Sequence, residues 1–165
     1  MSEIEKVGIG HLKVLKGTGI LAAYGLGSCI GLFLYDRGSH VGGLAHIMLP
    51  GAAPETVASK NKFAENAIGS MLKQMEALGA EPSRIGAVLI GGSHMFRESA
   101  GDARESIGEK NVNGVTQNLK ARSIRIVGED VGGEYGRTVE VNIEDGTVQI
   151  KSFRFGIKEI RWSSR

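Results

Sequence analysis

The stretch that decides the fold is GILAAYGLGSCIGLFLYD, residues 19–36, whose first charge is Asp36. Short apolar runs on either side of a glycine-rich centre are typical of two buried strands joined by a sharp turn. The pattern predicts strands over residues 20–24 and 30–35 and a turn over residues 25–28. A membrane-spanning helix would need about 20 consecutive apolar residues. This run is shorter and is interrupted by glycines, so we expect no membrane insertion.

Further elements are predicted outward from this stretch. Apolar side chains recur at three- and four-residue steps from Phe63 to Leu78, and Gly79, a residue typical of helix ends, follows them. A weaker helix is predicted over residues 109–121, and the polar residues 97–106 are predicted to be a loop. The other predicted strands are a pair over residues 7–16 and single strands over 41–49, 85–90, 124–127, 137–143 and 147–155.

Length and composition agree with one soluble domain. The sequence has 165 residues, of which 41% are hydrophobic and 23% are charged, and about 100–200 residues is usual for a domain. Its 25 glycines are roughly twice the usual share of about 7%. Glycine at that density favours tight turns and close backbone approaches. We therefore expect one strand-rich α+β domain over residues 1–165.

Charge and cysteine content exclude several classes of protein. The net charge is only +2 and no basic block is interleaved with aromatic residues, so nucleic acid is not an expected partner. A single cysteine cannot form an internal disulfide, and the charged residues 1–6 do not resemble a secretory signal, which favours a cytoplasmic protein. The four histidines show no zinc-binding spacing, and no nucleotide-binding fingerprint occurs. We therefore expect neither a metal nor a cofactor.

The single cysteine, Cys29, is the remaining candidate for chemistry. One interpretation is structural, because a single cytosolic cysteine is often an inert buried residue, here within a ligand-binding domain. Its position favours another interpretation. Cys29 follows the glycine-rich turn, so backbone N–H groups around Gly27 and Ser28 are expected to converge near its sulfur and form an oxyanion hole. In this second interpretation Cys29 is a nucleophile.

The spacing from Cys29 to His46 supplies a candidate base. We take residues 37–38 as a two-residue hairpin loop, with Asp36 opposite Ser39. Counting back along both strands then places Cys29 opposite His46. Directly opposed residues have Cβ atoms about 4.5–5.5 Å apart, so a sulfur and an imidazole can meet. Such a pair is expected to lower the pKa of the cysteine, whereas a one-residue change of register would put the two on opposite faces.

The same residues carry a resemblance to a known family. GLGSCIGLFLYD (residues 25–36) followed by GGLAHIMLP (residues 42–50) resembles the signature of CheD, the bacterial chemoreceptor glutamine deamidases. Further matching blocks follow in the order of the family, namely KFAENAI (62–68), IGGSHMF (90–96), IGEKNV (107–112) and EDVGGEYGRTVE (129–140).

This resemblance implies a fold, an activity and partners. The implied fold is an α/β sandwich similar to the catalytic domain of glutamine-deamidating bacterial toxins. The implied activity is conversion of selected glutamine side chains to glutamate on the cytoplasmic helices of chemoreceptors (methyl-accepting chemotaxis proteins). By matching position, Cys29 is the nucleophile and His46 the base. Many members of the family also bind a CheC-type phosphatase, which is therefore a second expected partner.

Two positions depart from the family pattern. The third catalytic residue of the family is a threonine six positions before the cysteine, and here that position is Ala23, which has no hydroxyl. Either Ala23 orients His46 through its backbone carbonyl, or activity is weakened. The second case leaves open an adaptor that binds a CheC-type phosphatase or receptors without catalysis. His94 stands where a small residue is expected, and we place it at the surface or at a pocket rim.

Overall fold

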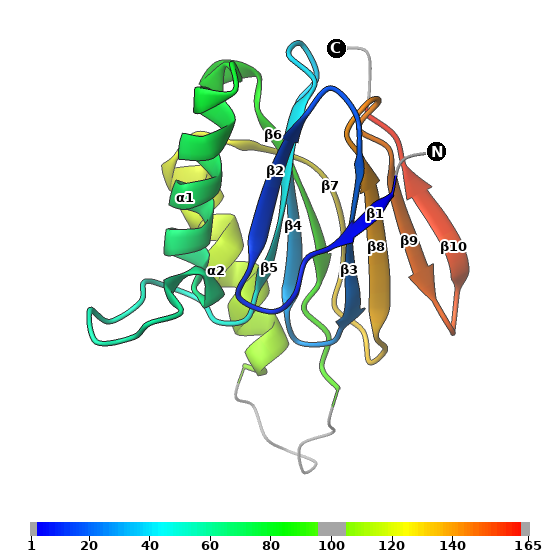
Figure 1. The fold of residues 1–165 in the computed structure, drawn as a ribbon. Coiled ribbons are helices and arrows are strands. Elements are labelled where there is room, and N and C mark those ends of the chain that lie inside the picture. The colour runs from blue at the N-terminus through cyan, green and yellow to red at the C-terminus, as the bar shows by residue number, and fades with distance from the viewer. Residues whose placement is uncertain (1–2, 96–104, 163–165) are drawn as a thin grey trace.

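Ten strands and two α-helices are formed by the residues that the computed structural model describes, 3–95 and 105–162 (Figure 1). The helices are α1 (Ala64–Ala77) and α2 (Ile107–Ala121), and short 3-10 turns lie at Lys60–Lys62 and Pro82–Arg84. The strands are β1 (Ile4–Lys6), β2 (Leu12–Lys16), β3 (Ile20–Leu26), β4 (Ile30–Asp36), β5 (Val41–Ile47), β6 (Gly86–Gly91), β7 (Arg125–Val131), β8 (Arg137–Asn142), β9 (Val148–Ser152) and β10 (Gly156–Ile160).

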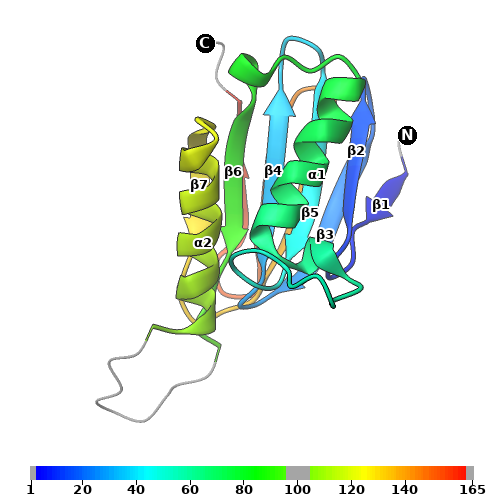
Figure 2. The same cartoon turned by 90° about the vertical axis from the view of Figure 1, so that its left-hand side faces the viewer.

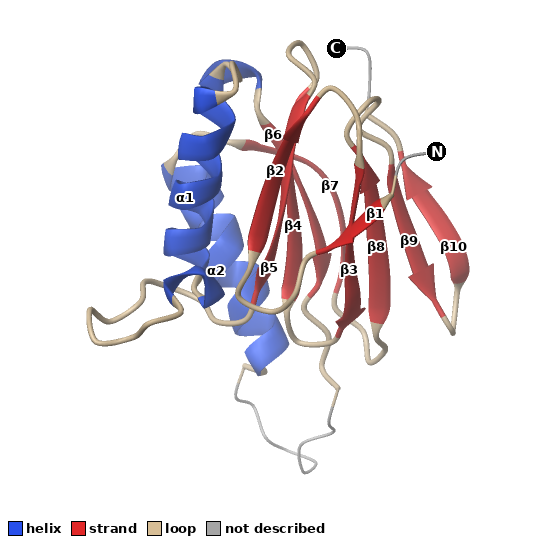
Figure 3. Ribbon diagram, in the orientation of Figure 1, coloured by secondary structure: helices blue, strands red, loops and turns tan. Residues whose placement is uncertain are grey.

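The strands form two packed sheets, and the helices cover one of them. The first sheet has the order β1-β3-β8-β9-β10 and the second the order β2-β5-β4-β6-β7. Figure 2 shows α1 and α2 lying across the second sheet, and Figure 3 shows the first sheet on the opposite side of it. The resulting layers are helix, sheet and sheet. This arrangement confirms the predicted strand-rich α+β sandwich.

Strand β4 is central to both apolar layers. Leu32 and Leu34 pack toward the helices, whereas Phe33 and Tyr35 pack between the sheets. All seven residues of β4 are buried. A strand that is buried on both faces needs no alternation of polar and apolar residues, which is why the stretch is continuously apolar in sequence.

Helix α1 confirms the predicted periodicity. Its buried residues recur at three- and four-residue steps and belong to the apolar cluster that faces the second sheet. Helix α2 begins two residues earlier than predicted, because Ser106 caps it by accepting a hydrogen bond from the Glu109 N–H at 3.1 Å.

Three predictions of elements were wrong. The predicted strand pair over residues 7–16 is a single strand, β2, which pairs with β5, whereas β1 lies before this range and pairs with β3 in the other sheet. The predicted turn over residues 25–28 starts later, since β3 continues to Leu26 through a bulge at Gly25, whose φ is +64°. The predicted strand over residues 147–155 ends at Ser152, and a turn then leads into β10, a strand that was not predicted and that pairs with β9. Most of the predicted loop over 97–106 lies outside the described residues.

One end of the sandwich gathers segments that are far apart in the sequence. The β3–β4 turn, the β7–β8 turn, the β9–β10 turn and the first turn of α2 all lie at the lower end in Figure 1. The β4–β5 hairpin lies at the opposite end. Neither described helix is long and apolar enough to cross a membrane.

Candidate functional site

Cys29 ends the turn between β3 and β4. It is half-buried and packs against the apolar cluster between the sheets. Every carbonyl of this turn is held by a donor from a different segment. Gly27 O accepts from Ser93 N at 2.8 Å, Ser28 O accepts from Asn111 Nδ2 at 2.8 Å, and Cys29 O accepts from Gly92 N at 2.9 Å.

These bonds fix the direction of the N–H groups in the turn. In a planar trans peptide the C=O and the following N–H point in opposite directions. The N–H groups of Ser28 and Cys29 therefore point away from the donors that hold the Gly27 and Ser28 carbonyls. Within residues 3–95 and 105–162, neither N–H donates a hydrogen bond to another residue. The turn thus offers two backbone donors beside the sulfur of Cys29.

The close contact between the end of β6 and the β3–β4 turn requires a glycine at position 91. The φ of Gly91 is +111°, and a Cβ at this position would lie 2.2 Å from Cys29 O. A side chain there would push β6 away and break the bond from Gly92 N to Cys29 O. The glycine therefore makes that bond possible.

His46 is a buried residue of β5, 3% exposed. Its Nδ1 lies 3.1 Å from Val7 O. A carbonyl can only accept, so Nδ1 carries the ring proton and Nε2 is left with its lone pair free. Among the described residues this buried Nε2 has no hydrogen-bond partner. The ring is therefore held in the tautomer that a general base requires.

The acceptor for His46 differs from the expected one. The sequence suggested the carbonyl of Ala23, whereas the structure gives that role to Val7. Val7 is itself fixed, because its N–H donates to Ala22 O at 2.7 Å. Ala23 is fully buried and contributes its methyl group to the cluster between the sheets.

The predicted register of the β4–β5 hairpin was wrong by two residues. Gly31, not Cys29, lies opposite His46, and the loop spans residues 37–40. Asp36 stabilises the longer loop, because its carboxylate accepts from Gly38 N at 2.9 Å and from the Ser39 hydroxyl at 2.8 Å.

A two-residue shift preserves the face, since side chains alternate with a period of two. Cys29 contacts the cluster between the sheets, and so does Leu44, whose side chain points to the same side of β5 as that of His46. Cys29 and His46 are therefore diagonal neighbours rather than directly opposed ones. Residues in this relation are about 7–8 Å apart, within reach of longer side chains. Gly31, which lies opposite His46, adds no side chain between them.

Burial favours the neutral forms of both groups. It raises the pKa of the Cys29 thiol. For His46, burial lowers the pKa, the hydrogen bond to Val7 acts in the opposite direction, and the charge of Lys6 lowers it further. The expectation that the pair lowers the pKa of the cysteine is therefore wrong for the unliganded protein. Both shifts favour a thiol and a neutral imidazole.

A cavity of about 180 Å³ lies beside the turn. Ser28 forms one wall of it, and His94 lines it, in agreement with the pocket-rim position expected for that residue. The backbone N–H of His94 donates to Gly133 O at 2.8 Å, which holds this segment against the β7–β8 turn. The other lining residues are Ser93, Met95, Ser106, Ile107 and Gly108.

Asn111 of α2 is a site residue that the sequence argument did not single out. It is completely buried, and its Nδ2 donates to Ser28 O at 2.8 Å and to Met48 O at 2.9 Å. Met48 stands two residues after His46. One side chain therefore connects the segment of the candidate nucleophile to the segment of the candidate base. Two signals were present in the sequence: Asn111 lies in the block IGEKNV that resembles the family, and the helical period of α2 places its amide inside.

Arg137 is a second such residue. It is 2% exposed, and its Nη1 donates to the Ser93 hydroxyl and to Gly132 O, both at 2.8 Å. Its Nη2 donates to Asp130 Oδ1 at 3.2 Å. Ser93 in turn supplies the N–H that binds Gly27 O, so the arginine supports the turn indirectly.

No group of three or more metal-ligating side chains occurs within the residues that the structure describes.

Comparison with known proteins places the chain in a family. The family model for CheD, described as chemotactic sensory transduction, matches residues 48–152. The probable chemoreceptor glutamine deamidase CheD of Thermococcus kodakarensis is 42% identical over 152 residues, which are 92% of this chain and 94% of that protein. Its counterpart in Caldanaerobacter subterraneus is 42% identical over 160 residues, 96% of this chain and 99% of that protein.

A third relative is named a chemoreceptor glutamine deamidase without the word "probable". The chemoreceptor glutamine deamidase CheD of Halalkalibacterium halodurans is 38% identical over 162 residues, which are 97% of this chain and all of that protein. Identity at this level over nearly the whole length confirms the resemblance carried by the sequence blocks. The chain belongs to the CheD family.

Proposed function

We propose that this protein is a cysteine-dependent deamidase that converts specific glutamine side chains on the cytoplasmic helices of chemoreceptors to glutamate. The names of its relatives, chemoreceptor glutamine deamidases, support this activity. The observation that carries the proposal is the β3–β4 turn, where the N–H groups of Ser28 and Cys29 donate to no other described residue. We place the reaction in the cytoplasm, where those helices lie.

In the first half of the reaction, the sulfur of Cys29 attacks the carbon of the glutamine carboxamide. His46 Nε2 takes the thiol proton as the C–S bond forms. The carboxamide oxygen becomes negative, and the N–H groups of the Gly27–Ser28 and Ser28–Cys29 peptides bind it. His46 then gives its proton to the departing nitrogen, so ammonia leaves and a thioester remains.

In the second half, water attacks the thioester carbon and His46 takes one of its protons. The tetrahedral intermediate collapses, the C–S bond breaks, and the proton returns to the sulfur. Each cycle consumes one water and releases one ammonia and one glutamate side chain. Because His46 starts and ends neutral, its low pKa keeps the base available at neutral pH.

Replacement of the nucleophile is the direct test. Cys29→Ala is expected to abolish deamidation of a receptor cytoplasmic fragment while the thermal unfolding curve stays unchanged, because a methyl group cannot form a thioester. The measurement is the mass gain of glutamine conversion in the fragment. Thr18→Ala, an exposed change in a distant turn, is the matched control and should keep full activity. Conversion by the Cys29→Ala protein would show that Cys29 is not the nucleophile.

The second candidate function is an adaptor that binds receptors or a CheC-type phosphatase without catalysis. It is favoured by Ala23, whose buried methyl group supplies no hydroxyl to the site. The same assay separates the two functions. If the protein is an adaptor, the wild type will bind the receptor fragment but the mass of the fragment will stay unchanged.

A further inference from the structure

The β9–β10 hairpin exposes three large apolar side chains within five residues. Phe153 is 108% exposed, Phe155 49% and Ile157 63%. Strand β10 is also the edge of its sheet, with β9 as its only partner strand. Clustered exposed apolar side chains on a sheet edge are costly in water and usually mark a surface that another molecule covers.

The hairpin is cationic as well as apolar. Residues 151–160 contain three basic residues and one carboxylate. Arg154 and Lys158 lie over the ring of Phe155, 5.4 Å and 4.7 Å from its centre. Lys151 pairs with Glu140 at 3.2 Å and Lys158 with Asp130 at 3.7 Å, whereas Arg154 has no carboxylate partner within the part of the chain that the structure describes. The hairpin therefore complements a partner that carries both apolar and acidic side chains.

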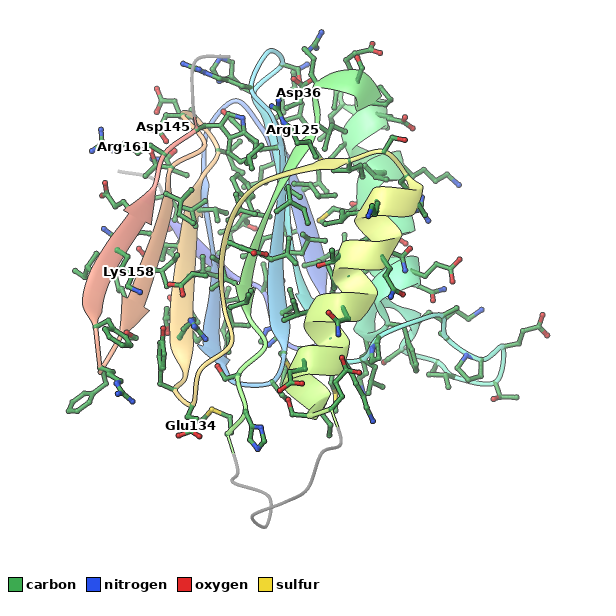
Figure 4. The ribbon with its side chains drawn as sticks, turned by 180° about the vertical axis from the view of Figure 1, so that it is seen from behind. Asp36, Arg125, Glu134, Asp145, Lys158 and Arg161 are labelled. Atoms are coloured by element: carbon green, nitrogen blue, oxygen red, sulfur yellow. The ribbon has the colours of Figure 1, made fainter. Side chains whose placement is uncertain are left out.

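Contacts connect the hairpin to the candidate catalytic turn. The ring of Phe155 packs edge-on against Tyr135, with centres 5.0 Å apart. Tyr135 O accepts from the Ser93 hydroxyl at 2.7 Å, and Ser93 N donates to Gly27 O at 2.8 Å. The β9–β10 turn lies at the same end of the sandwich as the β3–β4 turn in Figure 1. Figure 4 shows Glu134 near this end of the sandwich and Asp36 and Arg125 near the opposite end, with Lys158 along β10.

The cavity lined by Ser28, the residue before Cys29, is too small to recognise a whole helix. A volume of about 180 Å³ admits a single side chain, so selection of one glutamine among many needs contacts outside it. The charge of the hairpin indicates the character of the partner, because Arg154 and Lys158 complement acidic side chains on the helix that binds there.

We propose that the β9–β10 hairpin, through Phe153, Arg154, Phe155 and Ile157, docks an acidic amphipathic helix of the protein substrate while its glutamine enters the cavity lined by Ser28, the residue before Cys29. This inference rests on the proposed function and adds the surface that selects the substrate. The phenyl and isoleucyl side chains cover the apolar stripe of the helix. Arg154 pairs with its carboxylates.

The test compares a large substrate with a small one. The variants are the double substitution Phe153→Ser with Ile157→Ser, and the single substitution Arg154→Glu. Leu78→Ser is the matched control, because Leu78 is 38% exposed and follows α1 at the opposite end of the molecule. Each protein is assayed with a helical receptor fragment and with a short peptide that contains the same glutamine.

The double variant should lower kcat/KM for the helical fragment by about tenfold, mainly through KM, as expected for loss of a central aromatic contact. Deamidation of the short peptide and the rate of Cys29 alkylation by iodoacetamide should stay as in the wild type. Arg154→Glu should show a loss that shrinks as salt is added, because the ion pair is exposed and screened. The control should behave as the wild type with both substrates.

Three other outcomes would overturn the inference. If the variants process the helical fragment as well as the wild type does, the hairpin is not a docking surface, and the proposed function stands. An equal loss on the short peptide would mean that the hairpin shapes the catalytic turn. Vesicles of phosphatidylglycerol that bind the wild type but not the double variant, with unchanged kinetics, would assign the hairpin to a lipid surface. Failure of the wild type on both substrates would instead refute the proposed function.

Discussion

At the scale of single residues, burial controls the proton of the candidate pair. Cys29 is half-buried, and among the described residues no cation lowers its pKa; His46 is almost completely buried with its Nδ1 on a carbonyl. A thiolate and an imidazolium in this place would each lose hydration, which favours the neutral forms. The neutral pair is therefore the resting state, and the proton moves only when sulfur attacks.

The first residue-scale prediction concerns the pH dependence of Cys29 alkylation. Burial raises the pKa of the thiol, so iodoacetamide should reveal an apparent pKa above the value of about 8.5 for free cysteine. The His46→Ala protein should keep a high value, because neutral His46 does not stabilise the thiolate. The measurement is the alkylation rate between neutral and alkaline pH. An apparent pKa below that of free cysteine, lost in the His46→Ala protein, would indicate a preformed ion pair.

At the scale of elements, α2 fixes two loops to each other. Asn111 binds Ser28 O beside the nucleophile and Met48 O beyond the base, at 2.8 Å and 2.9 Å. Its orientation is unambiguous, because an amide oxygen facing two carbonyls would be repelled. The helix therefore acts as a brace that holds the β3–β4 turn against the end of β5. In this view Asn111 is a positioning residue.

The prediction for this element is that Asn111→Leu destabilises the protein and lowers activity together. It leaves the partly buried carbonyls of Ser28 and Met48 without this donor, which costs about 2 kcal/mol, and it frees the turn that carries the oxyanion donors. Thermal unfolding and kcat/KM on the receptor fragment measure the two effects. Asn113→Leu is the matched control, since Asn113 is exposed on the same helix. Equal activity of both variants at a temperature where both are folded would refute the positioning role.

At the scale of the whole molecule, the functional end is assembled from segments that meet only in the folded protein. The β3–β4, β7–β8 and β9–β10 turns meet there with the start of α2 (Figure 1). The other end is closed by the β4–β5 hairpin, where Arg84 pairs with buried Asp36 at 2.9 Å. We expect a receptor helix or a CheC-type phosphatase to bind at the first end.

The prediction at this scale is protection of Cys29 by its partners. A bound receptor fragment or a CheC-type phosphatase should slow iodoacetamide alkylation of Cys29 several-fold, because it covers the way to the sulfur. The rate is measured with and without saturating partner, and a denatured partner serves as control. Equal rates with a partner shown to be bound would place the partner elsewhere on the molecule.

The amino-acid sequence by itself determined the local elements and the family. The continuous apolar run of β4 and the three- and four-residue steps of α1 both follow from burial. Each pattern lies within a short stretch of the chain and can therefore be recognised in the sequence. The blocks around Cys29 and His46 identified the family and the candidate pair. They also placed Cys29 at the start of a strand next to that of His46; in the structure Cys29 lies in the turn directly before β4, which pairs with β5.

Only the tertiary structure decided how the site is held. Asp36 selects the longer β4–β5 loop through contacts that include Glu81 and Arg84, far along the chain. The acceptor for His46 is Val7, 39 positions away, and Asn111 reaches Ser28 across 83 positions. Such contacts produce no periodic pattern in the sequence, because each one depends on which distant segments are packed together in the folded protein. The packing of two sheets and a helix therefore decided the tautomer of His46, the direction of the turn's N–H groups and the resting proton of Cys29.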